Sequence, residues 1–60
     1  IMKNIEEFKT LTKPKMVVII IETMVQQGWE ISNFVYGFKA YTKSELINNY
    51  KRLIDYGKIN

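Results

Sequence analysis

The sequence predicts a mainly α-helical protein with three to four helices in one small domain that spans residues 1–60. Apolar residues recur with helical spacing over two long stretches, and residues that begin or end helices bound both of them. The composition agrees, because 47% hydrophobic and 25% charged residues are ordinary for a globular domain. A chain of 60 residues is long enough for one such domain only.

The first predicted helix is short and begins after Asn4. Asn4 is a preferred N-cap residue, and Glu7 stands three residues later, where a carboxylate can complete a capping box. Ile5, Phe8 and Leu11 then supply the apolar contacts.

Residues 14–27 predict a second helix. Pro14 ends the preceding helix and suits the first turn of the next, and Gly28 suits the position just after its end. The i, i+3, i+4, i+7 stripe consists of Val17, Ile20, Ile21 and Met24. The β-branched run 17–21 would also suit a buried strand. The pattern continues through Val25, which is too long for a typical strand and favours the helix.

This second helix carries more apolar residues than one stripe requires. Val18, Ile19 and Val25 widen its apolar surface almost all round, as in a central helix of a packed monomer. Alternatively, the surplus face meets a second copy of the chain or another protein, because a 60-residue core is thin enough for association to help. The sequence therefore offers a homodimer through Val18, Ile19 and Val25 as an alternative to a packed monomer.

The last helix has the clearest signals. Thr42 and Glu45 have the spacing of a capping box, and Tyr41 and Leu46 have that of a hydrophobic staple. The predicted helix spans 43–56 and ends at the glycine that follows. Its apolar stripe consists of Leu46, Tyr50, Leu53 and Ile54.

Residues 29–41 fit either a short helix followed by a turn or a short β-hairpin. Helical spacing is shown by Ile31, Phe34, Val35 and Phe38, and strand spacing by Phe34, Tyr36 and Phe38. Gly37 disfavours the interior of both elements. The two structures stay open at this point.

The aromatic residues of this segment have two interpretations. If the segment is extended, Phe34, Tyr36 and Phe38 form a stacking platform for single-stranded nucleic acid. The favoured interpretation places Trp29, Phe34 and Phe38 in the core, because a small domain needs its large side chains inside. Tyr36 and Tyr41 are then the partly exposed members.

The residue inventory excludes several classes of function. The chain has no cysteine and no histidine, so it lacks disulfides, zinc–thiolate sites, thiol nucleophiles and the commonest general base. Its six carboxylates are scattered, and its three dispersed glycines form no phosphate-binding loop. We expect a protein that is not an enzyme and that holds no cofactor and no metal.

The hydropathy pattern predicts a cytoplasmic protein without a membrane partner. The longest apolar run, Met16–Ile21, is far shorter than the ~20 residues that span a bilayer. Glu6 and Glu7 interrupt the N-terminal region where a signal peptide would lie.

The order of helix, glycine, short segment, turn, capped helix and glycine over residues 14–59 resembles that of a winged helix-turn-helix domain. In this resemblance 15–28 is the first core helix, 31–38 the second, and 39–41 the turn. Thr42 then opens the recognition helix. The stretch from Leu53 to Ile59 resembles the family's ending, Leu-x-x-x-Gly-x-Ile, which leads into the wing. The two wing strands would begin where the chain stops, so the match is to a wingless or truncated, helix-turn-helix-like variant.

The resemblance implies that the last helix enters the major groove of DNA. Its outward candidates for DNA contact are Lys43, Ser44, Asn48, Lys51 and Arg52. Ser44 and Asn48 suit base edges, and the three basic side chains suit phosphates. The net charge of +3 agrees, because residues 39–60 carry five basic and two acidic side chains. Asp55 on the same face opposes it.

The predicted function is therefore that of a small basic DNA-binding protein, a transcription regulator or accessory factor that acts as a dimer. Two alternatives stay open. The chain can be a protein–protein interaction module or stoichiometric inhibitor from a phage or other mobile genetic element. The outward polar residues of the last helix can also be only a solvated helix face, since exposed helices are polar without any ligand.

Overall fold

The computed structural model describes residues 3–30 and 37–59, and the side chains of residues 58 and 59 lie outside that description. In chain order the elements are α1 (Ile5–Lys9), α2 (Lys13–Gln26), the 3₁₀ helix η1 (Gly37–Ala40) and α3 (Lys43–Ile59). The mainly helical class is thus confirmed. The hairpin alternative for residues 29–41 is not supported, because the described part of that segment holds no strand and includes η1. The short helix expected over 31–38 lies mostly outside the described residues, and its last two positions are 3₁₀.

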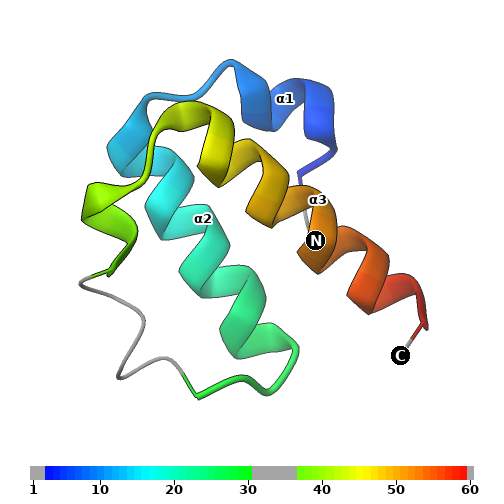
Figure 1. Cartoon of the computed structure of the whole chain (residues 1–60). Helices are drawn as coiled ribbons and strands as arrows, with labels where there is room; N and C mark the ends of the chain where they lie inside the picture. The colour runs from blue at the N-terminus through cyan, green and yellow to red at the C-terminus, as the bar shows by residue number, and fades with distance from the viewer. Residues whose placement is uncertain (1–2, 31–36, 60) are drawn as a thin grey trace.

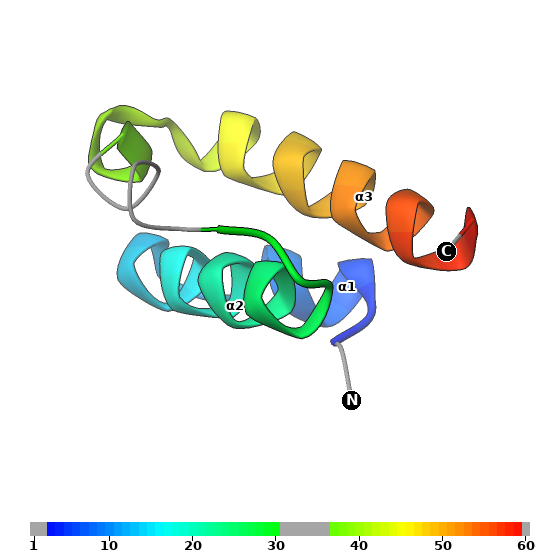
Figure 2. The same ribbon diagram turned by 90° about the horizontal axis from the view of Figure 1, so that it is seen from below.

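The helices form two layers (Figure 2). α1 and α2 make one layer, and α3 lies across both of them in the other, packed against each. α2 and α3 lie side by side and run in the same direction in both views (Figures 1 and 2). Their starting ends therefore lie near the same end of the molecule, and η1 lies there too.

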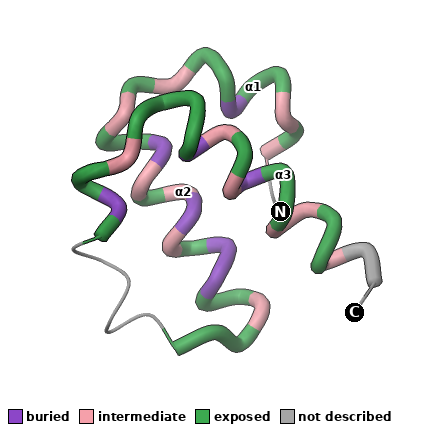
Figure 3. The backbone as a smooth tube through the Cα atoms, in the orientation of Figure 1, coloured by how far each residue is buried: buried purple, intermediate pink, exposed green. Residues whose placement is uncertain are grey.

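The core lies between the two layers and draws on every helix (Figure 3). Its buried apolar residues are Phe8, Met16, Ile20, Met24, Phe38, Leu46 and Tyr50. The rings of Phe8 and Tyr50 stack with centroids 4.1 Å apart, and the Tyr50 hydroxyl donates to the carbonyl of Lys3. These two contacts attach α1 to α3.

The buried face of α2 is rotated from the predicted stripe. Ile20 and Met24 are buried as expected, but Met16 and Thr23 complete the face, and Val17 and Ile21 are only partly buried. The Thr23 hydroxyl donates to the carbonyl of Ile19 at 2.8 Å, which satisfies a polar group in the core. The rotation turns more of the apolar surface of α2 outward.

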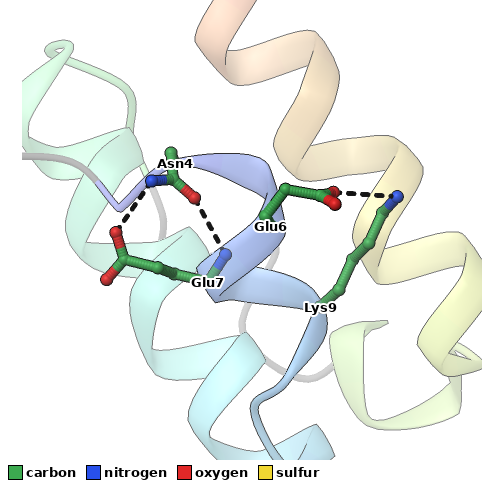
Figure 4. A network of polar contacts seen from close by, with 4 residues as sticks. All are labelled: Asn4, Glu6, Glu7 and Lys9. Carbon is green, nitrogen blue, oxygen red and sulfur yellow. Dashed lines mark hydrogen bonds and ion pairs between the residues drawn. The ribbon is translucent and has the colours of Figure 1, made fainter.

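α1 begins as its cap predicted (Figure 4). The Asn4 side-chain oxygen accepts from the Glu7 backbone N–H at 2.9 Å, and the Asn4 amide donates to the Glu7 carboxylate at 2.8 Å. An exposed ion pair of 3.3 Å joins Glu6 to Lys9 on the same helix. These local contacts order a helix of only five residues, which is too short to be stable alone.

α2 ends in a Schellman motif at Gly28. Gly28 has φ +85°, which an L-residue rarely adopts. The Trp29 N–H bonds to the carbonyl of Met24 at 2.9 Å, and the Gly28 N–H bonds to that of Val25 at 3.0 Å. The predicted role of Gly28 is confirmed.

Trp29 is a correction to the sequence prediction. It was expected in the core but is 41% exposed, whereas Phe38 is buried and Tyr41 is partly exposed as predicted. The cause is its position directly after the Schellman turn, beyond the ends of the core stripes. The Trp29 ring packs on Tyr56 with centroids 5.1 Å apart, and its N–H donates to the Gln27 side chain at 3.2 Å. The predictions for Phe34 and Tyr36 lie outside the described residues.

α3 begins with the predicted capping box. The Thr42 N–H donates to the Glu45 carboxylate at 2.8 Å, and the Glu45 N–H donates to the Thr42 hydroxyl at 3.2 Å. The predicted end at Gly57 is wrong, because α3 continues to Ile59. Gly57 does not adopt positive φ, so it forms no left-handed cap. It stays in the helix at a cost of about 1 kcal/mol relative to Ala.

Within the described parts of the chain, no helix combines the length and hydropathy needed to cross a bilayer.

Candidate nucleic-acid interface

The outward face of α3 carries all the side chains that the sequence singled out for DNA contact. The five residues Lys43, Ser44, Asn48, Lys51 and Arg52 are exposed. α3 forms its layer with its inner side against α1 and α2, and no other described helix lies over its outer side (Figure 2). At 100° per residue Ser44, Asn48, Lys51 and Arg52 share one stripe opposite the buried Leu46 and Tyr50. We call these five residues the α3 face.

The side chains of the α3 face make no hydrogen bond or ion pair with any other described residue. Their polar neighbours are used by the helix itself. Glu45 closes the capping box, and the Asn49 amide donates to the carbonyl of Glu45 at 2.9 Å. Thus two polar residues of α3 serve the fold, while those of the α3 face keep their donors and acceptors for other partners.

A polar hollow lies along the α3 face. It has a volume of about 270 Å³ and is lined by Tyr41, Glu45, Asn48, Asn49 and Arg52. Asn48 and Arg52 stand four residues apart, so their side chains are neighbours one above the other on the helix. An amide and a guanidinium side by side are the groups that most readily make bidentate contacts to base edges or phosphates.

The α3 face is only weakly basic by itself. Lys43, Lys51 and Arg52 are opposed by Glu45 and Asp55 on the exposed side of the same helix. These five described side chains sum to a net charge of +1, which is small for a surface that meets a polyanion. Two lysines from other elements add positive charge near the start of α3.

Lys13 and Lys39 supply that charge at the start of the helix. The Lys13 ammonium donates to the carbonyl of Lys39 at 3.1 Å, which joins the start of α2 to η1. The two lysines flank a hollow of about 390 Å³ whose other walls are Pro14 and Val17. Lys43 begins α3 four residues after Lys39. We call Lys13, Lys39 and Lys43 the lysine end.

The fold explains why these lysines gather. Because α2 and α3 run in the same direction, their first turns lie near the same end of the molecule (Figure 1). The N-terminal end of a helix carries partial positive charge, so two such ends and three ammonium groups favour anions at this end. No local sequence pattern connects Lys13 with the last helix, since the Lys13–Lys39 contact spans 26 residues.

The described residues also bear on whether the chain can hold a metal ion. No group of three or more His, Cys, Asp or Glu side chains is placed there to hold a metal ion. That the protein is not an enzyme stays a prediction from its residue inventory.

No family model, no curated protein and no solved structure matches this chain. The resemblance to winged helix-turn-helix domains therefore rests on the sequence pattern over residues 14–59.

Proposed function

We propose that the protein binds double-stranded DNA with the α3 face in the major groove and the lysine end on the phosphate backbone. The observation that carries this proposal is the uncovered stripe of unengaged polar and basic side chains on α3. α3 has 17 residues, which corresponds to a length of about 25 Å. A major groove about 12 Å wide admits one such helix.

The contacts divide into two kinds. Ser44 and Asn48 lie in the middle of the stripe and reach base edges, with Asn48 best suited to adenine. Lys51 and Arg52 lie beside them and reach phosphates, which fixes the helix in the groove without reading sequence. The lysine end contacts the backbone where α3 enters the groove.

The proposed biological role is that of a regulatory or accessory DNA-binding factor. It does not depend on a complete helix-turn-helix motif. That motif needs a helix directly before α3 at about 90–120° to it, and the positions for such a helix lie mostly outside the described residues. The α3 face and the lysine end are described in full.

One alternative has an observation in its favour. Val18 and Val25 on α2 are 54% and 55% exposed, which suits a protein–protein interaction module. The α2 and α3 surfaces lie on different layers, so a protein partner on α2 and DNA on α3 are compatible.

The test is the salt dependence of binding to a labelled duplex, measured by fluorescence anisotropy. Phosphate contacts by the five basic side chains of the α3 face and the lysine end give a slope of log K against log salt of about −4 to −5. Lys51→Ala is expected to weaken all sequences alike and to reduce the slope by about one. Asn48→Ala is expected to relax sequence preference and leave the slope unchanged.

Lys9→Ala is the matched control, because it removes one positive charge from α1 in the opposite layer. It should leave the slope unchanged. Absence of binding at low salt would contradict the proposed function. Equal binding by the parent, Asn48→Ala and Lys51→Ala would show that DNA does not meet the α3 face.

A further inference from the structure

The outward side of α2 is an exposed apolar ridge. Pro14, Val18 and Val25 are exposed and Ile21 is half-buried beside them. Val18 and Val25 are 54% and 55% exposed, and no described helix lies over this side of α2 (Figure 2). We call these four residues the α2 ridge. Their spacing of four, three and four residues is that of a helix seam that packs against another helix.

A pair of opposite charges runs beside the α2 ridge. Lys15 and Glu22 are both exposed and lie on the same flank of the helix. Neither forms an ion pair or side-chain hydrogen bond with another residue that the structure describes. They are seven residues apart, as are Val18 and Val25, so the charged strip and the apolar strip run parallel over two helical turns.

We propose that the α2 ridge is the interface of a two-fold symmetric homodimer in which α2 packs antiparallel to α2 of the second copy. In such an interface each contact occurs twice. A two-fold axis that passes between the two α2 helices at the level of residues 18–21 brings Lys15 close to Glu22 of the partner subunit, and the reverse. The two ion pairs then lie along one side of a continuous apolar seam.

The charge pattern indicates both that the partner is a second copy of the chain and that its α2 runs antiparallel. The strip carries one positive and one negative group, so it complements an inverted copy of itself. In a parallel two-fold pair the charged flanks of the two copies would lie on opposite sides of the seam, so neither Lys15 nor Glu22 would meet an opposite charge. A uniformly acidic or basic partner would leave one of the two charges opposed by a like charge.

The surface beside the α2 ridge is shaped to receive side chains. A hollow of about 290 Å³ follows its flank and is lined by Lys3, Leu11, Lys15, Val18 and Ile19. Ile19 is half-buried and packs on the core. Of the three residues that the sequence offered for a dimer, Val18 and Val25 therefore lie on the ridge and Ile19 lines the hollow next to it.

The first test is the mass of the full chain by sedimentation equilibrium over a dilution series. We expect twice the 7.1 kDa of the monomer at high concentration. Val25→Asp should weaken association by at least about tenfold, because the substitution enters a symmetric interface twice. A circular dichroism spectrum like that of the parent shows that the variant is folded.

The second test exchanges the charges. Lys15→Glu and Glu22→Lys should each weaken association by up to about tenfold, since each alters two symmetry-related pairs. The double variant should restore it. Asp55→Lys is the control, because it makes the same charge change as Glu22→Lys on α3.

Each outcome decides the proposal. A monomer at all concentrations overturns it, and so does a dimer that survives Val25→Asp. Failure of the double variant to restore association overturns the antiparallel arrangement. None of these measurements uses DNA, so the dimer stands or falls separately from the proposed function.

Discussion

The outer sides of α3 and α2 differ in a way that their inner sides do not. Both helices bury an apolar stripe between the layers, with Leu46 and Tyr50 on α3 and Met16 and Ile20 on α2. On the outside, α3 presents unengaged polar and basic side chains, whereas α2 presents valines that are more than half exposed. Folding constrains the inner sides, so the outer sides carry the information about partners.

The two outer surfaces are unequal as evidence. Polar residues on an exposed helix are expected with or without DNA, so the α3 face needs a functional test. An exposed apolar seam on a small protein is less easily explained by the monomer. The rotation of α2 leaves Val18 and Val25 outside, and the proposed self-association rests on that exposure.

The largest effect should follow from removing the contact that holds the two layers together. Tyr50→Ala deletes the stack on Phe8 and the bond to the Lys3 carbonyl. We expect a loss of about 3–5 kcal/mol in the free energy of unfolding, as for other buried aromatic residues. Chemical denaturation followed by circular dichroism measures it.

Tyr50→Phe is the companion variant, because it keeps the ring and removes only the hydroxyl. It should cost about 1 kcal/mol, the value of one hydrogen bond. Equal losses for the two variants would show that the aromatic stack does not join α1 to α3.

The next largest effect is on the linking of two DNA duplexes by one dimer, which depends on both outer surfaces. Because they lie on opposite layers (Figure 2), the proposed dimer turns its two α3 faces away from each other. Such a dimer links two duplexes, unlike a helix-turn-helix dimer, which reads half-sites about 34–36 Å apart on one duplex.

Capture of a labelled duplex on beads that carry a second duplex measures this bridging. The double variant Val18→Ser with Val25→Ser should bind DNA with the parent's salt slope but capture none of the labelled duplex. If the variant captures as much labelled duplex as the parent does, the α2 ridge is not what links the two duplexes.

A smaller effect concerns the lysine end. The double variant Lys13→Ala with Lys39→Ala should lower the magnitude of the salt slope for duplex binding by about two. Its self-association should not change, since the α2 ridge is intact. An unchanged slope in the anisotropy titration would remove the lysine end from the DNA interface.

The starts of α2 and α3 provide a matched pair of caps. The Thr42 hydroxyl accepts a hydrogen bond from Glu45, whereas Thr12 at the start of α2 makes no side-chain cap bond. Thr42→Ala should therefore cost about 1 kcal/mol, and Thr12→Ala should stay within about 0.5 kcal/mol of the parent. Urea denaturation of the parent and the two variants measures these losses in the free energy of unfolding. Equal losses for the two variants would contradict the difference between the caps.

The smallest effect is on pH dependence. Burial raises the pKa of the Tyr50 phenol above its ordinary value of 10.0, and the negative charge of Glu7 raises it further. Hydrogen bonds to Lys3 and Thr23 lower the pKa and offset part of this rise. A raised folded-state pKa gives stability that is full below pH 10 and is lost as the pH rises through the folded value. Tyr50→Phe should flatten this alkaline decline in urea denaturation, and an identical decline would place its cause elsewhere.

Three local signals were predicted from the sequence because each acts within five residues. The Asn4 cap, the Thr42–Glu45 box and the Gly28 terminus all appear in the structure. Each depends on a hydrogen bond between near neighbours, so the order of residues is sufficient.

Features that depend on distant contacts were not predicted. Trp29 lies outside the core because α2 ends before it, and its ring rests on Tyr56 from the last helix. The Lys13–Lys39 contact follows from the parallel course of α2 and α3, which no local pattern encodes. The exposure of the five residues of the α3 face agrees with the sequence pattern, because they share a helix with a clear apolar stripe.

Nuclear magnetic resonance of the ¹⁵N-labelled protein with a short duplex tests most directly that the two outer surfaces have different partners. We expect DNA to shift the amide signals of residues 43–52 and of Lys13 and Lys39, and to spare those of Val18, Ile21 and Val25. Shifts confined to the α2 ridge, or no shifts at low salt, would contradict it.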